Sequence, residues 1–471
     1  ILLNDNENAQ PLEAVNYYKR AINKGSSYAM YKYAQILYNG SNGIEKDTKK
    51  AFDYYQMAIR KGQIDAMFDY AQITYNNNDI IDNKIESAHY FEKAANKGHI
   101  KAMIFYAKML NEGDGIDQDQ KKANSYYKMA ADKGDVDSMF IFAKNLKNGI
   151  GIDEKKKDNE SVKKKAAEYF EKAANKGHSD SMFEAGQLFD HDDYTFCDYE
   201  KAAKFYKMAI EKSDTTKYHA MNNLALLYEN GNGVPQNLKE AVNYFKLATD
   251  HNDPDATNNY ARLLFYGKGI DEDKMKSAHY YKIAADLGNS SAMNNYANML
   301  YYGQGIEVDK SESFNYYYKS AKKGNKYACY NYALLLEKGE IQGDININMN
   351  LAKIFLKEAS NKNHTYAAYH YAVLLTNEMN DLADKKLVDY DDPNDPYILK
   401  KIERVQYFKI AADNGHVESM FQYGRLKYFG IGTDIDQVEG YLYLQKAYKN
   451  GSKKAESLLQ SIECAKACSI C

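Results

Sequence analysis

Proline is rare in this chain, with five among 471 residues. A proline inside a helix removes a backbone hydrogen bond and clashes with the preceding turn, so this scarcity is what an almost wholly helical chain requires. Tryptophan is absent while 45 tyrosines occur, so we expect tyrosine to fill many apolar positions. No run of about 18 apolar residues is present, which excludes a membrane-spanning helix within this sequence.

An excess of basic residues is also missing. Lysine and arginine total 62 against 65 aspartates and glutamates, and the formal net charge is −3. A nucleic-acid-binding protein usually shows a basic patch or a high isoelectric point. We therefore expect no nucleic-acid partner. The opening residues Ile1 to Asp5 lack the charged and apolar pattern of a signal peptide.

Cysteine is scarce as well, with five in the chain. Cys197 and Cys329 stand alone, which favours a reducing, cytoplasmic compartment. Cys464, Cys468 and Cys471 share one face of a terminal helix, but without a nearby histidine they fall short of four zinc ligands. The last four residues formally fit a prenylation box, although cysteine is unusual as its final residue. We interpret these three cysteines as small apolar residues, and we expect no metal or cofactor.

What the chain has in abundance is one pattern that recurs about every 36 residues. Ala-Met-x-x-Tyr/Leu-Ala is followed by a Gly-rich turn and then by Lys-Ala-x-x-Tyr-Tyr-x-x-Ala-Ala-x-x-Gly. A period of this size indicates stacked two-element units in place of one globular core. Residues 1–471 are therefore predicted to form a single repeat solenoid.

The repeats divide the chain as follows. Residues 11–25 are the second helix of a partial repeat, 26–451 form eleven full repeats, and 452–471 form a C-terminal capping helix. The full repeats span 26–62, 63–98, 99–134, 135–177, 178–213, 214–252, 253–288, 289–324, 325–363, 364–415 and 416–451. Because the chain begins within a repeat, we expect its N-terminus to be incomplete.

Each repeat is predicted to form two helices. In residues 289–324, Ala292, Met293, Tyr296 and Ala297 mark one side of the first helix at helical spacing, and Tyr317 belongs to the second. Most second helices end at a glycine, whose missing Cβ suits a left-handed position after the last turn.

Three repeats end differently. Asn252 and Asn363 replace the terminal glycine in two of them, and asparagine is the next best residue for the left-handed conformation. Ser213 is the exception and indicates another kind of ending.

Gly-x-Gly-Ile/Val sequences, such as Gly303–Gly305, lie between the helices of many repeats. No strand precedes them, no Lys-Ser/Thr follows, and the third glycine of a dinucleotide-binding motif is absent. We interpret them as turns between helices and not as phosphate-binding loops.

These residues resemble the Sel-one-like repeat (SLR) family, a branch of the tetratricopeptide-like α/α solenoids. The resemblance is carried by Ala292-Met293-Asn294-Asn295-Tyr296-Ala297, by Tyr301–Ile306 and by Tyr317–Gly324, and it covers nearly the whole chain. It implies an all-α, right-handed superhelical solenoid. It also implies a non-catalytic adaptor that binds a protein or peptide partner in its concave groove.

The resemblance leaves two other functions open. Family members also act as regulatory subunits of membrane-associated enzyme complexes, of the endoplasmic-reticulum ubiquitin-ligase or chitin-synthase type. Such repeats also occur fused to catalytic domains, which would then lie outside these residues. The His-Arg-Asp, Asp-Phe-Gly and Gly-x-Ser-x-Gly motifs of kinases and hydrolases are absent, so we expect no catalysis from residues 1–471.

Three places depart from the regular pattern. A Lys-rich insertion near 153–165 favours a solvated loop or helix extension, with contact to an acidic partner as the alternative. An acidic, proline-broken insertion near 379–402 lacks the glycine of a calcium loop, and we predict a mobile surface loop there, with partner docking as the alternative. In the fifth repeat, Asp190-His191-Asp192-Asp193-Tyr194 replaces the Gly-x-Gly turn. A solvated turn is favoured over a metal site, because no second histidine lies at ligand spacing.

The candidate binding residues are the two that follow Ala-Met in each first helix, because these helices line the concave side in the family. From the first repeat to the last, the pairs are Tyr31-Lys32, Phe68-Asp69, Ile104-Phe105, Phe140-Ile141, Phe183-Glu184, Asn222-Asn223, Asn258-Asn259, Asn294-Asn295, Tyr330-Asn331, Tyr369-His370 and Phe421-Gln422. The early pairs are largely aromatic or aliphatic, and asparagines follow.

Asparagine recurs at the second place of four successive pairs: Asn223, Asn259, Asn295 and Asn331. An asparagine side chain both donates and accepts, so it matches the N–H and C=O of an extended backbone. We predict a partner-binding site of Asn222, Asn223, Asn258, Asn259, Asn294, Asn295, Tyr330 and Asn331. The alternatives are that these amides bond to the neighbouring helix, and that the upstream aromatic residues are buried between helices and do not anchor a partner.

Overall fold

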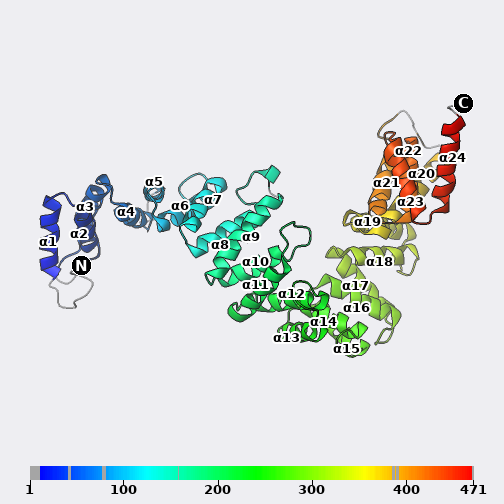
Figure 1. Cartoon of the computed structure of the whole chain (residues 1–471), viewed down its shortest axis with the longest axis horizontal. Coiled ribbons are helices and arrows are strands. Elements are labelled where there is room, and N and C mark those ends of the chain that lie inside the picture. Colours follow the sequence, from blue (N-terminus) through cyan, green and yellow to red (C-terminus); the bar gives the residue numbers. More distant parts are fainter. Residues whose placement is uncertain are drawn as a thin grey trace. The chain divides into compact units, whose positions relative to one another are not determined.

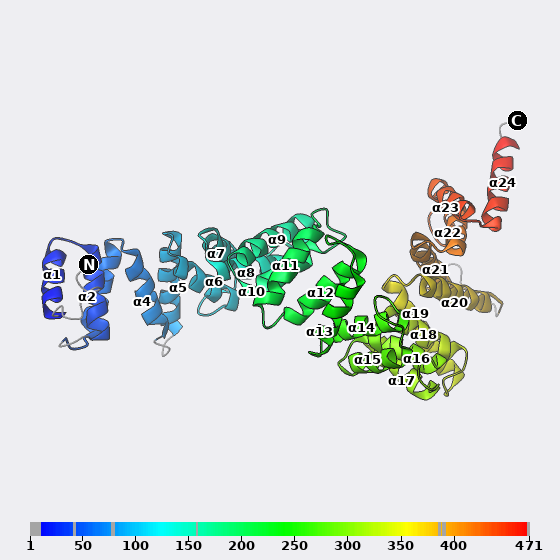
Figure 2. The ribbon, with the colours of Figure 1, turned by 60° about the horizontal axis from the view of Figure 1, so that its bottom comes forward.

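The computed structural model describes residues 11–40, 44–76, 81–156, 159–384, 388 and 392–468. These residues contain 24 α-helices, one short 3₁₀ helix and no β-strand, which confirms the all-α prediction (Figure 1). The chain divides into two compact units, Ile1–Asn237 and Leu238–Cys471, and each is a succession of paired helices (Figures 1 and 2).

The described helices of the first unit are α1 (Pro11–Asn23), α2 (Ser27–Asn39), α3 (Thr48–Arg60), α4 (Ile64–Asn76), α5 (Ile81–Asn96), α6 (Ile100–Glu112), α7 (Gln120–Asp132), α8 (Val136–Asn148), η1 (Glu154–Lys156), α9 (Glu160–Asn175), α10 (Ser179–Phe189), α11 (Tyr199–Lys212) and α12 (Lys217–Asn230). Those of the second unit are α13 (Leu238–Thr249), α14 (Pro254–Tyr266), α15 (Lys274–Asp286), α16 (Ser290–Tyr302), α17 (Lys310–Lys322), α18 (Lys326–Glu337), α19 (Ile345–Asn361), α20 (Thr365–Asp384), α21 (Pro396–Asp413), α22 (Val417–Phe429), α23 (Gln437–Lys449) and α24 (Lys453–Cys468).

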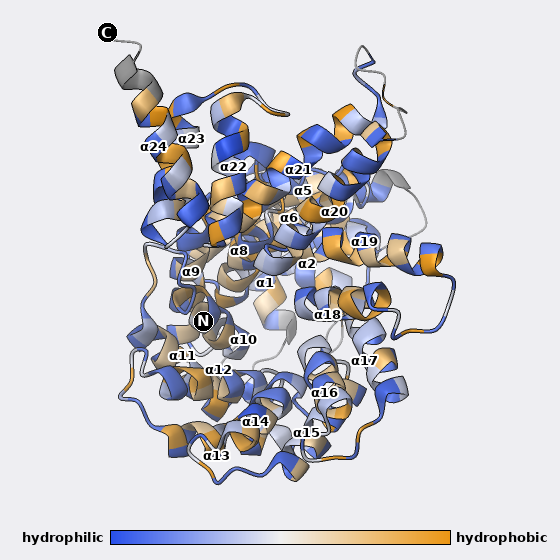
Figure 3. Cartoon of the chain, turned by 90° about the vertical axis from the view of Figure 1, so that its right-hand side faces the viewer, coloured by the Kyte–Doolittle hydropathy of each residue, from blue (hydrophilic) through white to orange (hydrophobic). Residues whose placement is uncertain are grey.

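The helices carry apolar and polar residues on different sides, which Figure 3 shows as alternating orange and blue along each ribbon. The core consists of the faces that successive helices press together, and alanines such as Ala297 and Ala333 are fully buried there. Stability thus comes from contacts between neighbouring repeats, as expected for a solenoid.

The two helices of a repeat cross where both carry small residues. At this crossing, Ser87, Ser277 and Ser313 of the second helices are fully buried. The Ser277 hydroxyl donates to the Ala261 carbonyl at 2.7 Å, and the Ser313 hydroxyl to the Ala297 carbonyl at 2.8 Å. The other repeats have alanine at the same position of the second helix, with two exceptions: glycine in the last repeat and an arginine in α21.

The Gly-x-Gly turns have a structural purpose. Gly303 ends α16 in the left-handed conformation with φ 67°, and Gly305 has φ 76°. A Cβ on Gly305 would lie 2.5 Å from the carbonyl carbon of Lys274 in α15, so the turn packs directly against the second helix of the preceding repeat. The following Asp309 caps α17 by accepting from the Glu312 N–H at 2.9 Å.

The predicted endings of the second helices are confirmed. Asn252 and Asn363 have positive φ values of 61° and 58°, the only such values among the described residues other than glycine. Ser213 ends α11 in an extended conformation, with φ −105° and ψ 129°.

Both insertions are partly helical. In 153–165, η1 is followed by residues 157–158, which lie outside the described residues, and α9 begins at Glu160. Helix extension therefore accounts for the end of this insertion. In 379–402, α20 continues to Asp384 and α21 begins at Pro396. The mobile loop predicted between them falls largely on residues 385–387 and 389–391, outside the described residues.

The C-terminal cysteines are described only in part. Cys464 is exposed, whereas the side chains of Cys468 and Cys471 lie outside the described residues. Helix α24 includes Cys468.

Candidate functional site

The residues that follow Ala-Met in the first helices form, within each unit, a strip that is here called the paired-residue row. Most of them are partly buried, so their side chains reach the surface of the stack. Contacts join the row from one repeat to the next. The Tyr31 hydroxyl donates to Asp69 Oδ2 at 3.0 Å, and the rings of Phe68 and Phe105 lie 5.8 Å apart.

Four asparagines of the row form a chain of hydrogen bonds in the second unit. Asn331 of α18 donates from Nδ2 to Asn294 Oδ1 of α16 at 3.1 Å. Asn294 Nδ2 donates to Asn295 Oδ1 at 3.5 Å, and Asn295 Nδ2 donates to Asn258 Oδ1 of α14 at 3.2 Å. Three first helices are thus linked through their amide side chains.

The register of this network is diagonal. The second asparagine of one repeat bonds to the first asparagine of the repeat before it. Each amide therefore uses some of its hydrogen-bonding groups within the protein. A side-chain amide offers two N–H donors and an oxygen that accepts two bonds. The network therefore leaves donors and acceptors on Asn258, Asn295 and Asn331, which are partly exposed.

The remaining predicted residues of the second unit differ in access. Asn294 is only 7 % exposed, so it supports its neighbours more than it faces solvent. Asn259 is partly buried beside Asn258 on α14. Tyr330, the first residue of the Tyr330-Asn331 pair on α18, is also partly buried. Burial raises the pKa of the Tyr330 phenol, which keeps its hydroxyl protonated and able to donate.

The asparagines of the first unit belong to a different cluster. Asn222, which is 7 % exposed, donates to Asn223 Oδ1 at 3.1 Å, and Asn223 Nδ2 donates to the Tyr206 hydroxyl at 3.1 Å. Tyr206 in turn donates to Asp190 Oδ2 at 3.0 Å. Burial raises the pKa of Asp190 to about 6. Asn223 and Asp190 line a pocket of about 470 Å³ that also includes His191.

The turn around His191 has the character of a packed surface turn. The His191 ring stacks on Tyr194 with 4.3 Å between ring centroids. In the described part of the chain, no three His, Cys, Asp or Glu side chains are grouped so as to hold a metal ion.

Sequence reasoning missed the histidines that pack against the aromatic members of the row. The His99 ring lies 4.5 Å from Phe68 of the preceding repeat, and His416 lies 4.3 Å from Tyr369. The same arrangement joins two further pairs, Phe140 with His178 at 4.5 Å and Tyr330 with His364 at 4.7 Å.

These histidines also begin helices. His99 Nδ1 accepts from the Ala102 N–H at 3.1 Å, and His364 Nδ1 accepts from the Ala367 N–H at 3.1 Å. Burial lowers the pKa of His99, His364 and His416, which favours the neutral ring that this capping bond requires.

The sequence did contain a signal for this arrangement. After an aromatic first pair residue, the next first helix is often capped by histidine, whereas after Asn222, Asn258 and Asn294 it is capped by Asp253, Asn289 and Asn325. The row and the helix caps therefore vary together along the chain.

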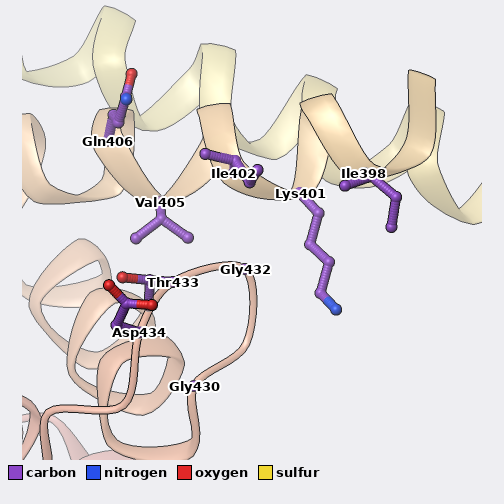
Figure 4. A pocket seen from close by; sticks show the side chains of 9 residues that line it. All are labelled: Ile398, Lys401, Ile402, Val405, Gln406, Gly430, Gly432, Thr433 and Asp434. Atoms are coloured by element: carbon purple, nitrogen blue, oxygen red, sulfur yellow. The ribbon is translucent and has the colours of Figure 1, made fainter. Parts of the chain in front are cut away.

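A second surface hollow lies at the long insertion. A pocket of about 560 Å³ is bounded by the first turns of α21 and by the turn between α22 and α23. Figure 4 shows Ile398, Ile402 and Val405 of α21 on the side that faces Gly432 and Thr433. Ile402 is 47 % exposed.

No helix in the described part of the chain combines the length and apolarity needed to cross a membrane.

Solved structures show what this fold is similar to. A Sel1 repeat protein from Oxalobacter formigenes is 22 % identical, with a TM-score of 0.54, over 69 % of this chain and 90 % of its own. A protective antigen of uropathogenic Escherichia coli with an SLR fold is 20 % identical over 96 % of this chain and 90 % of its own, with a TM-score of 0.49. No curated protein gives a significant match to the chain.

The repeat pattern itself is matched by the Sel1 repeat family along most of the chain. The matched residues are 8–26, 27–63, 64–99, 100–135, 148–178, 179–214, 219–253, 254–289, 290–325, 326–364, 405–416 and 417–452. The longest gap, residues 365–404, contains the acidic insertion, where the sequence departs from the repeat, whereas the Lys-rich insertion lies within the matched residues 148–178. The chain therefore belongs to the Sel1 repeat family, whose repeats generally serve as non-catalytic protein-interaction scaffolds.

Proposed function

We propose that this protein is a scaffold that holds an extended peptide segment of a partner protein along the paired-residue row. The observation that carries the proposal is the amide network of the second unit. Asn258, Asn295 and Asn331 are held in place by hydrogen bonds to one another and to Asn294, and they keep donors and acceptors at the surface.

Fixed amides suit the backbone of an extended peptide. Each peptide unit presents an N–H and a C=O, and a side-chain amide pairs with both. Because the network already orders the amides, less side-chain entropy is lost when a peptide binds. Recognition through the backbone would be tolerant of sequence, as in other modes that bind extended segments.

The aromatic members of the row would add apolar contacts. Tyr330 and Tyr369 each pack against a capping histidine, with ring planes tilted by 30° and 39°, so their rings are held by the protein before a partner arrives. Rigid aromatic side chains of this kind are enriched among the residues that dominate binding energy. We infer that they anchor side chains of the segment next to the amide network.

The test is selection from a displayed library of random 12-residue peptides, followed by affinity measurement with synthetic peptides. Replacing Asn258, Asn295 and Asn331 together with alanine should weaken binding. Each lost hydrogen bond is worth about 1 kcal/mol, which predicts a loss of roughly a hundredfold in affinity.

A matched control replaces Asn243, Asn315 and Asn350 with alanine, because these asparagines are exposed on the second helices α13, α17 and α19. The control should bind like the unmodified protein, and both variants should retain their helical content. Equal affinity of the two triple variants would refute the role of the row.

A further inference from the structure

One residue breaks the rule of small side chains at the crossing of the two helices. Counted back from the end of each second helix, this position is Ala14, Ala51, Ser87, Ala123, Ala166, Ala202, Ala241, Ser277, Ser313, Ala352, Arg404 and Gly440. Arg404 of α21 is the longest and the only charged side chain among them. The described members other than Arg404 and Ala14 are fully or almost fully buried.

Arg404 is buried too, at 9 % exposure. Its Nε is enclosed and has no hydrogen-bond partner, and within the described residues no carboxylate lies within ion-pair distance of its guanidinium. Of the Arg404 side-chain nitrogens, only Nε is enclosed without a partner. The two Nη nitrogens, at the forked end of the side chain, reach solvent.

A second guanidinium lies nearby. Burial lowers the pKa of Arg404; the phenol of Tyr397 opposes this, and the charge of Arg425 on α22 lowers it further. The Arg425 Nε is likewise enclosed without a partner. The two arginines therefore repel each other in a partly desolvated place.

Such an arrangement is costly unless something compensates for it. Removing part of a guanidinium from water without giving it a partner is unfavourable, and a second positive charge nearby adds to the cost. The carboxylates that adjoin the two arginines in sequence or through Gln422 are already engaged. Glu403 pairs with Lys357 at 2.8 Å, and Glu418 pairs with Lys454 at 3.0 Å. Buried polar groups without partners in a folded protein commonly mark a functional site or a bound ion.

The pair adjoins the paired-residue row. Arg425 Nη2 donates to Gln422 Oε1 at 3.2 Å, and Gln422 is the second pair residue of the last full repeat. Gln422 also donates to Glu418 at 2.9 Å, which fixes the side of the amide that faces Arg425.

We propose that Arg404 and Arg425 form an anion-binding site that holds a carboxylate of the peptide segment bound along the row. The planar fork of a guanidinium matches the two oxygens of a carboxylate, and two forks provide the charge that such a group needs. The proposal rests on the proposed function, and it adds a preference for acidic segments to a surface that is otherwise tolerant of sequence.

The test uses the full chain and the same displayed library of random 12-residue peptides. Peptides selected by the unmodified protein should be enriched in aspartate and glutamate relative to the starting library. Arg404→Met, which keeps an unbranched stem like that of arginine but removes the guanidinium and its charge, should still select peptides but lose this enrichment. Arg425→Gln should act in the same direction, and Lys282→Ser, at an exposed lysine of α15, should retain the enrichment.

A synthetic peptide then separates the sources of the anion. Exchanging glutamate for glutamine in a selected peptide should weaken binding to the unmodified protein at least fivefold and leave binding to Arg404→Met unchanged. If inorganic phosphate at millimolar concentration displaces the peptide while the exchange has no effect, the site serves phosphate and the carboxylate assignment is wrong.

The stability of the free protein gives a second readout. Because the substitution removes the enclosed Nε without a partner and the repulsion between the two arginines, the thermal midpoint of Arg404→Met should equal or exceed that of the unmodified protein. A clear fall in the midpoint would overturn the proposal, since the guanidinium would then be supported by the fold itself. Selection of peptides without acidic enrichment would overturn it while leaving the scaffold function intact, and failure to select any peptide would contradict both.

Discussion

At the scale of single residues, the capping histidines show how one side chain serves two repeats. His99 and His416 each accept a backbone N–H with one face of the ring packed on an aromatic residue of the preceding repeat. The capping bond requires a neutral ring nitrogen, and burial of the ring also favours the neutral imidazole. The charged form would lose the acceptor atom and would be poorly solvated.

The pH dependence of stability follows from the lowered pKa values of His99, His364 and His416. Because the unfolded chain binds protons near the usual histidine pKa of about 6.5 and the folded chain binds them only at lower pH, the unfolded state holds more protons between the two values. This stabilisation is complete above about pH 6.5 and is lost as the pH falls through the folded-state values. We expect a lower thermal midpoint at pH 5 than at pH 7.5, measured by circular dichroism.

A variant isolates these histidines from other titrating groups. Replacing all three with asparagine, the residue that caps α16 and α18, should reduce the difference between the two midpoints. Replacing the exposed His279 should leave the difference unchanged. The raised pKa of Asp190 acts in the opposite direction near pH 6 and is common to all variants. An undiminished difference in the triple variant would rule out the histidine explanation.

Several single-residue predictions came from local physics alone. Asn252 and Asn363 were recognisable because few residues other than glycine adopt a left-handed conformation. The alternative that these asparagines bond to the neighbouring helix is confirmed for Asn331 with Asn294 and for Asn295 with Asn258. Which amides pair was not recognisable, because the pairing depends on how adjacent helices are offset. Arg404 was visible in the sequence, but only by comparing the same position across all repeats.

At the scale of elements, the turn between the helices of a repeat also fixes how that repeat stacks. Gly305 combines a positive φ with close approach to the Lys274 backbone, whereas Gly62 has φ 86° and no atom near its missing Cβ. A side chain at Gly62 would meet only backbone strain, whereas a side chain at Gly305 would meet backbone strain and a steric clash with α15.

We predict that Gly305→Ala destabilises the protein more than Gly62→Ala. Strain alone costs about 1 kcal/mol for alanine in this conformation. Crowding against the preceding helix adds about 1–3 kcal/mol to Gly305→Ala. The measurement is the thermal midpoint together with amide hydrogen exchange, which should rise in α15, α16 and α17 and remain unchanged in α2, α3 and α4. A similar effect of the two substitutions would show that the turn does not set the stacking.

The elements were predicted well because the 36-residue pattern states where each helix begins and ends. The insertions were predicted less well. Helix α20 continues to Asp384 because residues such as Met379 are buried along its extra turns. The repeat pattern does not predict that extension.

At the scale of the whole molecule, each repeat packs mainly on its neighbours, so the repeats tolerate different side chains on the paired-residue row without losing the fold. The first unit has a largely aromatic row, and the second unit has the amide network followed by Tyr369, Phe421 and the two arginines. We propose that this variation along the chain determines which segment binds, since the packing residues themselves hardly change.

The most direct test of the central claim is the affinity of a selected peptide whose backbone N–H groups have been methylated one at a time. If amides of the row hold the peptide backbone, methylation at the contacted positions should weaken binding to the unmodified protein at least tenfold. The same methylation should have little further effect on the variant in which Asn258, Asn295 and Asn331 are alanine. If methylation has no effect on the unmodified protein, or an equal effect on both proteins, the peptide backbone is not held by these asparagines and the account is wrong.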